Sequence, residues 1–295
     1  MKAYEYTLIV ILVWSSAATV TALVLKNLNN FQAGFYASIF STLTLLAFVL
    51  RQGKLKTVRQ CLLKPLPMVL MGFLSPFLYY ILFMGSIKIL GAAEAMIFIY
   101  FWPLIAVLLA MPILGERLTS KKIAAIVISL VGVFIVITKG SFANLFTNLY
   151  GDLVAIAAGG SWALFSVLGK KLNYDPISSL FVYNIFTLIF ITASLFLFSS
   201  FVIPTIDELA GIAWIGILNF GIAYVLWFKA LKLGDTAKIT NMTYVVPFLS
   251  LVWIFLVLKE NIQLISVLGL AVILFGVGLQ YRKSKIQKNW KSKKI

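Results

Sequence analysis

Hydrophobic positions in this chain form long uninterrupted runs, and polar residues gather in short segments between them. An α-helix needs about 20 apolar residues to cross a hydrocarbon core about 30 Å thick. The pattern therefore predicts an all-α membrane protein with ten transmembrane helices. The predicted spans cover residues 5–25, 31–50, 66–88, 92–112, 121–138, 151–170, 177–199, 209–231, 236–258 and 263–281.

The composition agrees with this pattern. Hydrophobic residues make up 62% of the 295 positions and charged residues 12%, and the mean hydropathy is +1.02. Soluble domains are only about half apolar. The first run begins close to Met1, but it is longer than a signal-peptide core and lacks a small-x-small cleavage site, so we expect it to be a retained span. The single cysteine, Cys61, excludes an internal disulfide.

An internal repeat with an offset of 144 residues links the two halves of the chain. The matched pairs are Gly72 and Gly216, Tyr80 and Tyr224, Lys88 and Lys232, Tyr100 and Tyr244, Pro103 and Pro247, Glu116 and Glu260, and Gly132 and Gly276. Five predicted spans separate the copies, and a unit of five spans ends on the opposite side of the membrane from its start. The sequence thus predicts two inverted five-helix repeats, 1–144 and 145–282, before a basic tail, 283–295. Inverted repeats are typical of secondary transporters, whose substrate site lies near the midplane between the halves.

The basic residues indicate the orientation. With the ten predicted spans, 21 of the 25 lysine and arginine residues fall on the side of the N-terminus. The positive-inside rule then places both termini in the cytoplasm, in a cytoplasmic (inner) membrane. We interpret the net charge of +16 as this orientation signal and therefore expect no nucleic-acid partner. The basic tail is expected to lie against anionic lipid. The four exceptions are Lys26, Lys88, Lys139 and Lys259.

Segment 93–118, AEAMIFIYFWPLIAVLLAMPILGERL, resembles the fourth span and following loop of EamA-domain proteins of the drug/metabolite transporter (DMT) superfamily. Ten spans, cytoplasmic termini and a five-plus-five repeat are also the plan of that superfamily. Within it, EA…Y.WP at 94–103, SWALFSVLGKKL at 161–172 and TYVVPFLS at 243–250 are similar to the aromatic amino acid exporter (YddG-type) branch. That resemblance implies an aromatic-lined central cavity and export as the direction of transport.

Two prolines are the predicted hinges. Pro103 and Pro247 occupy matching positions inside the fourth and ninth spans. A proline frees a carbonyl group of the preceding turn and bends the helix. In a membrane this is tolerated where the freed group faces protein or a water-filled cavity. The alternative for each proline is a kink that serves packing alone.

Aromatic and polar side chains inside the spans are the candidate substrate ligands. A tryptophan in mid-span needs a partner for its indole N–H away from lipid, and small neighbours at Gly160 let a ligand approach closely. For each aromatic residue the alternative is ordinary packing or a lipid-facing position. The predicted substrate-binding residues are Trp162, Tyr79, Tyr80, Tyr100, Trp102, Ser161, Asn219, Trp227, Tyr244 and Glu94.

Such a cavity suits flat apolar side chains by stacking and quaternary ammonium groups by cation–π attraction. Aromatic residues alone do not distinguish these two classes of substrate. We predict a secondary transporter of small metabolites, for which the resemblance to the exporter branch implies aromatic or neutral amino acids, with drugs or quaternary ammonium compounds such as choline as the alternative. We expect it to work by alternating access and as a monomer.

The acidic residues all lie at or near span ends, and the chain has no histidine. A proton-coupled carrier usually keeps a carboxylate near the midplane, so facilitated movement or exchange is favoured. Glu94 lies deepest in a span. Its alternative to substrate binding is a structural role, in which its carboxylate interacts favourably with the positive end of the helix dipole. No hydrolytic set or metal cluster can be assembled, so we expect no enzyme, cofactor or metal. A channel remains a rival, although channels commonly use subunit symmetry and filter loops.

Overall fold

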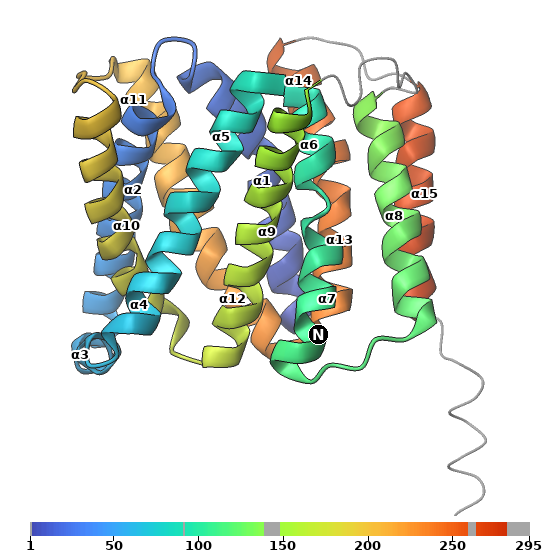
Figure 1. Ribbon diagram of the computed structural model, residues 1–295, viewed down its shortest axis with the longest axis horizontal. Helices are drawn as coiled ribbons and strands as arrows, with labels where there is room; N and C mark the ends of the chain where they lie inside the picture. Colours follow the sequence, from blue (N-terminus) through green and yellow to red (C-terminus); the bar gives the residue numbers. More distant parts are fainter. Residues whose placement is uncertain (1, 91, 139–147, 259–263, 282–295) are drawn as a thin grey trace, which may run out of the picture.

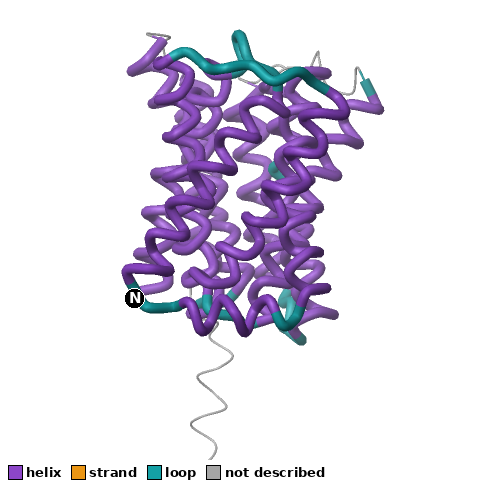
Figure 2. The backbone as a smooth tube through the Cα atoms, turned by 90° about the vertical axis from the view of Figure 1, so that its left-hand side faces the viewer, coloured by secondary structure: helices purple, strands orange, loops and turns teal. Residues whose placement is uncertain are grey.

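The computed structural model describes residues 2–90, 92–138, 148–258 and 264–281. Over those residues the chain is helical and contains no strand. The helices run roughly side by side and the loops gather at two ends (Figures 1 and 2). We call the end that carries Lys2 the basic end, and the opposite one the far end.

The helices are as follows. They are α1 (Lys2–Val24), α2 (Asn30–Arg51), α3 (Leu55–Leu62), α4 (Pro65–Gly72), η1 (Phe73–Leu78), α5 (Tyr79–Leu90), α6 (Ala92–Ile99), α7 (Trp102–Leu114), α8 (Ser120–Thr138), α9 (Leu149–Leu172), α10 (Pro176–Phe198), α11 (Ile206–Ala213), η2 (Trp214–Ala223), α12 (Tyr224–Leu233), α13 (Thr236–Met242), η3 (Thr243–Val245), α14 (Val246–Leu258) and α15 (Leu264–Tyr281).

Among the described residues, eight helical stretches are long and apolar enough to cross a membrane, and Leu264–Leu279 forms a shorter apolar helix. The chain is thus a multi-pass membrane protein. The ninth expected span, 236–258, is divided into α13, η3 and α14, so it is not one continuous helix of that length.

The short helix α3 was not expected. It is an amphipathic segment that buries Val58 and Cys61 and leaves Leu55 exposed. An ion pair of 2.6 Å between Lys54 and Asp175 fixes its start against the beginning of α10. An eight-residue helix is invisible to a search for runs of membrane-spanning length, but its period of apolar positions is the usual sign of a half-buried helix.

The third and eighth expected spans are interrupted in their middle. In η1, Ser75 has non-helical backbone angles (φ −159°, ψ 135°) just before Pro76. In the eighth span, the ten residues of η2 are π-helical and contain no proline. These interruptions place polar groups near the centre of the bundle.

Close helix packing in the bundle depends on glycines of the 144-residue repeat. A Cβ atom on Gly72 would lie 2.5 Å from the carbonyl oxygen of Tyr183 in α10, and one on Gly216 would lie 2.5 Å from that of Ala37 in α2. Each glycine therefore brings an interrupted span against a helix from the other half of the chain. Small residues at such crossings allow backbones in a membrane protein to touch.

The helices α1 and α9 are exchanged between the halves of the chain. The first of them packs against η2, α12 and α14, whereas α9 packs against α5, α6 and α7. This exchange brings the middle of both helices to the centre of the molecule, between the two interrupted spans. The pair α8 and α15 lies at one edge of the bundle (Figure 1).

Candidate functional site

A cavity of about 110 Å³ lies at the centre of the bundle, and its wall is mainly aromatic. A buried apolar cavity of ~150 Å³ is enough to hold a benzene ring, so this one has the size of a single flat group. The side chains of the wall come from α1, α5, α6, α7, α9, η2, α12, η3 and α14. They include Trp14, Tyr79, Tyr80, Phe83, Tyr100, Trp102, Trp162, Asn219, Phe220 and Tyr224.

Trp162 of α9 is at the middle of the aromatic wall. Its ring centroid lies 4.9 Å from that of Tyr224, 5.3 Å from that of Trp14 and 5.5 Å from that of Tyr79. Trp102 lies 6.1 Å away with its ring edge-on. These spacings are those of mutually attractive aromatic pairs, so the wall is a continuous aromatic surface built from five helices.

The break between α6 and α7 carries Tyr100 and Trp102 into the wall. Pro103 is the second residue of α7, a position where its missing N–H costs nothing. The carbonyl group that a proline frees is the one four residues earlier, at Ile99. A Cβ atom on Gly159 of α9 would lie 2.7 Å from that oxygen, so the freed group meets a surface of α9 without a side chain.

The second break has the same form. Helix α13 ends at Met242, the 3₁₀ turn η3 follows, and Pro247 is the second residue of α14. Tyr244 in the turn is buried, and its ring centroid lies 6.4 Å from that of Tyr100 in the first break. Residues matched by the repeat thus face each other across the centre of the molecule.

The two interrupted spans supply several polar groups at or next to the cavity wall. The hydroxyl groups of Ser75 and Tyr224 share a hydrogen bond of 3.2 Å. The side-chain amide of Asn219 and the hydroxyl of Tyr80 are buried and have no hydrogen-bond partner among the residues that the structure describes. No acidic or basic side chain is among the described residues of the wall, and no group of three metal-ligating side chains occurs in the described part of the chain.

The structure brings six of the ten predicted ligands to the cavity wall. Three others lie behind it: Ser161 donates a hydrogen bond to the carbonyl of Leu74 (2.7 Å), Trp227 donates one to Ser166 (3.0 Å), and Tyr244 is buried in η3. The side chain of Glu94 lies outside the described residues. The six on the wall are Tyr79, Tyr80, Tyr100, Trp102, Trp162 and Asn219.

Sequence reasoning left several wall residues off the list of ligands. Trp14 is a mid-span tryptophan like Trp162, and that signal was sufficient to include it. Tyr224 is the repeat partner of Tyr80, which was also a usable sign. Phe220 had no local signal, because in a chain that is 15% aromatic only packing decides which rings avoid lipid.

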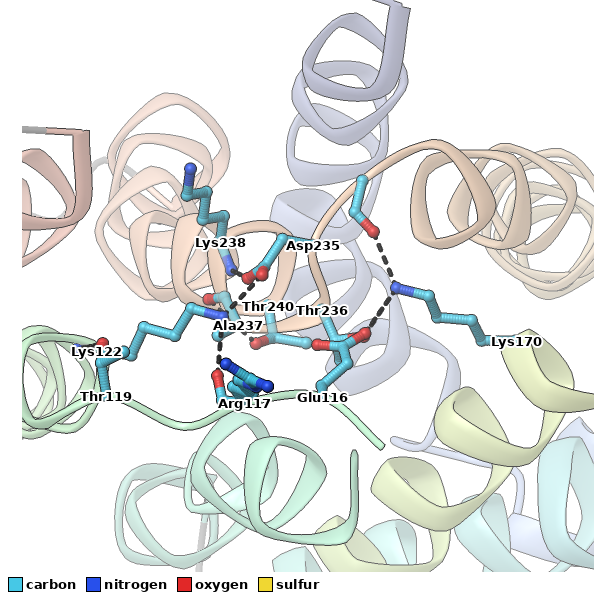
Figure 3. A network of polar contacts seen from close by, with 11 residues as sticks. Glu116, Arg117, Thr119, Lys122, Lys170, Asp235, Thr236, Ala237, Lys238 and Thr240 are labelled. Carbon is cyan, nitrogen blue, oxygen red and sulfur yellow. Dashed lines mark hydrogen bonds and ion pairs between the residues drawn. The ribbon is translucent and has the colours of Figure 1, made fainter. Parts of the chain in front are cut away.

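A network of polar contacts joins several segments at the basic end (Figure 3). Lys170, in the last turn of α9, donates hydrogen bonds to Glu116 Oε1 (2.8 Å), the carbonyl of Gly234 (2.7 Å) and Thr236 Oγ1 (3.0 Å). Thr236 Oγ1 also donates to the same Glu116 oxygen (2.6 Å). Three segments distant in sequence are thereby joined, and we call these four residues the latch.

A second ion pair lies beside the latch. Lys122 of α8 binds Asp235 Oδ2 at 2.6 Å and donates to the carbonyl of Arg117 at 3.2 Å. Asp235 is also the N-cap of α13, accepting from the backbone N–H of Lys238. The loop between α7 and α8 is therefore held against the turn between α12 and α13 at the basic end.

The cavity and the latch lie at different depths. On α1 (Lys2–Val24), which starts at the basic end, the cavity residues run from Trp14 to Thr21. On α9, Trp162 lies eight residues before Lys170, or about 12 Å along a helix. The latch thus lies nearer the basic end than the cavity does.

Known proteins resemble this chain over most of its length. A transporter of uncharacterised function from Archaeoglobus fulgidus is 26% identical over 96% of this chain and 98% of its own. The aromatic amino acid exporter YddG of Ancylobacter novellus is 27% identical over 63% of this chain and 66% of its own. A crystal structure with 23% identity superimposes with a TM-score of 0.83 over 95% of this chain and 96% of that one, which shows the shared fold.

The EamA-like transporter family matches residues 1–138 and 149–282. These two segments contain both interrupted spans, both proline breaks and every residue of the cavity wall. The relatives that carry a functional name are transporters, including the exporter above. The chain therefore belongs to the EamA-like transporter family of membrane proteins, within the drug/metabolite transporter superfamily.

Proposed function

We propose that this transporter is a secondary carrier of aromatic or neutral amino acids that works by alternating access. The observation that carries the proposal is the central cavity, whose wall is aromatic and whose described residues carry no charge. A flat apolar side chain is bound there by stacking on Trp162 and its neighbours. The exporter that this chain resembles supports the same substrate class.

A second candidate substrate is a quaternary ammonium compound such as choline, or a cationic drug. It is favoured by the clustering of Trp14, Trp162 and Tyr224 around one space, since aromatic faces attract cations. Carriers of cations commonly add a carboxylate within the membrane. The described wall offers none, and this ranks the amino acids first.

The proposal includes ten transmembrane helices in two inverted repeats, placed in the cytoplasmic membrane with the basic end and both termini in the cytoplasm. The two segments matched by the family and the paired breaks at Pro103 and Pro247 support it. The proposal takes a monomer as the transporting unit, and a cavity wall whose described residues come from one chain is consistent with it. The breaks serve as hinges, because irregular backbone there bends at lower cost than a continuous helix.

The driving force in this proposal is the substrate gradient, by facilitated movement or exchange. A proton-coupled pump commonly places a carboxylate or histidine on the substrate path, and the described wall contains neither. Uptake into proteoliposomes should therefore change little between pH 6 and pH 8. A strong pH dependence that disappears in Glu94→Gln would show proton coupling at that residue instead.

A competition experiment tests the substrate class. Purified protein is loaded with labelled phenylalanine and challenged with phenylalanine, tryptophan, threonine, choline and guanidinium. We expect the aromatic amino acids to displace the label at the lowest concentrations. Displacement or direct binding only by choline or guanidinium would replace the amino acids with the second candidate.

A further inference from the structure

Two polar side chains on the cavity wall lack partners that a buried polar group normally has. Asn219 of η2 is 3% exposed and Tyr80 of α5 is 4% exposed. Neither the amide oxygen and nitrogen of Asn219 nor the hydroxyl of Tyr80 has a hydrogen-bond partner within the described residues. Most buried polar side-chain atoms in proteins are paired with protein or ordered water. The side chains of Asn219 and Tyr80 are therefore candidates to form hydrogen bonds with a ligand.

Both groups lie on segments that meet at the cavity. Tyr80 packs edge-on against Phe220, the residue after Asn219, with ring centroids 5.3 Å apart. The neighbouring hydroxyls of Ser75 and Tyr224 satisfy each other and offer less to a ligand. Asn219 and Tyr80 are therefore two unpartnered polar side chains on the same cavity wall, and we call them the polar patch.

We propose that Asn219 and Tyr80 bind the charged head group of a zwitterionic amino acid, while its side chain stacks against the aromatic wall. The inference rests on the proposed function and specifies how that substrate is held. The amide oxygen of Asn219 accepts from the α-ammonium group, and the amide N–H and the Tyr80 hydroxyl donate to the α-carboxylate. The two charges of such a head group are adjacent and both are hydrogen-bonded here, so it is buried at lower cost than an isolated charge.

The polar patch also discriminates against compounds that lack either the α-ammonium or the α-carboxylate group. A quaternary ammonium group has no donor or acceptor, so it would leave Asn219 and Tyr80 unpaired. An unsatisfied buried polar group weakens binding by roughly 5- to 150-fold. The polar patch thus selects zwitterions, whereas the aromatic wall alone does not.

The test compares four ligands on purified protein in lipid nanodiscs. They are L-phenylalanine, phenethylamine, which lacks the carboxylate, 3-phenylpropionate, which lacks the ammonium group, and choline. The unaltered protein should bind phenylalanine at least about tenfold more tightly than the other three. In Asn219→Leu, phenylalanine should bind about tenfold more weakly, with its advantage over phenethylamine lost. Tyr80→Phe, which keeps the ring, should lose about fivefold.

A charge-changing variant gives a result in the opposite direction. Asn219→Asp places a carboxylate at the ammonium position and should bind phenethylamine more tightly than the unaltered protein does. The matched controls are Asn184→Leu and Tyr183→Phe, because both residues are buried but lie outside the cavity wall. Both controls should retain the ligand preference of the unaltered protein.

Different outcomes would refute the head-group assignment and the proposed function. If the unaltered protein binds phenylalanine but the Asn219 and Tyr80 variants keep both affinity and discrimination, the polar patch is refuted and the proposed function stands. If the unaltered protein binds none of the aromatic amino acids, the proposed function fails and the head-group assignment fails with it.

Discussion

Trp162 shows how a single side chain can define the cavity. Its ring lies within 6.2 Å, centroid to centroid, of tryptophans on α1, α7 and α12. Two residues close to it in sequence help to position it. Gly159 lets α6 pack closely against α9, and Ser161 donates a hydrogen bond to the carbonyl of Leu74. A large ring fixed on all sides presents a rigid face, which limits the entropy lost when a ligand stacks on it.

Removing that ring should weaken substrate binding without unfolding the protein. For Trp162→Ala we expect about 2 kcal/mol of lost affinity, or roughly 30-fold, because a central aromatic anchor is removed. Binding of labelled phenylalanine measures the effect, and size-exclusion behaviour checks the fold. Trp214→Ala is the control, since Trp214 is part-exposed and outside the wall. Equal affinity in the Trp162 variant and the unaltered protein would remove Trp162 from the site.

The single cysteine offers a second prediction at this scale. Cys61 lies on the buried face of α3 and is 3% exposed. Burial raises the pKa of its thiol, nearby Asp175 raises it further, and Lys64 lowers it only in part. Because the thiolate is the reactive form, maleimide should label Cys61 slowly at pH 7 and faster as the pH rises through this raised pKa. Cys61→Ala with Lys56→Cys, an exposed position on α3, should label faster at pH 7; equal rates would contradict the burial of Cys61.

At the scale of elements, the positions of proline in the sequence predicted some of the helix interruptions but not all of them. The paired positions of Pro103 and Pro247 predicted irregular backbone, and both follow a helix break. The π-helical segment η2 has no proline, and its course is set by contacts of Gly216 with α2. Local sequence therefore indicates where a helix cannot continue, but not where packing distorts one that could.

A pair of glycines on α15 tests the close contact with α8. A Cβ atom on Gly276 would lie 2.8 Å from the carbonyl oxygen of Ala125, whereas one on Gly278 would meet nothing within 4 Å. Gly276→Ala should destabilise the protein by about 2 kcal/mol through overpacking. Gly278→Ala should be neutral or stabilising by up to about 1 kcal/mol, since alanine favours helix. Thermal unfolding in detergent measures both, and equal effects would refute the backbone contact.

At the scale of the whole molecule, the latch and the cavity lie at different depths of the bundle. Lys170 joins the end of α9 to the loop after α7 and to the turn before α13, and the cavity lies further from the basic end. In the proposed alternating-access cycle, we expect these contacts to separate when the cavity opens toward the basic end. The sequence predicted the chain-wide repeat and the cavity helices, but not the latch, because its partners are brought together only by the fold.

Breaking the latch should shift the population toward states open at the basic end. In a Cys61→Ala background, a cysteine at buried Ala237 reports on that opening. Lys170→Met leaves Glu116 and Thr236 without their shared cation, and we expect maleimide labelling to rise by about tenfold. Lys171→Met removes an exposed neighbouring charge and should leave the rate unchanged. No rise in the Lys170 variant would show that the latch does not restrain this end.

Counterflow in proteoliposomes tests whether this protein is an alternating-access carrier of aromatic amino acids. Vesicles containing purified protein and unlabelled phenylalanine are diluted into labelled phenylalanine, with empty vesicles as the control. An alternating-access carrier with one central site predicts saturable uptake of label that is accelerated by substrate inside, at pH 6 and pH 8 alike. Uptake that neither saturates nor responds to internal phenylalanine would contradict a carrier, and failure of every aromatic amino acid to exchange would contradict the proposed substrate.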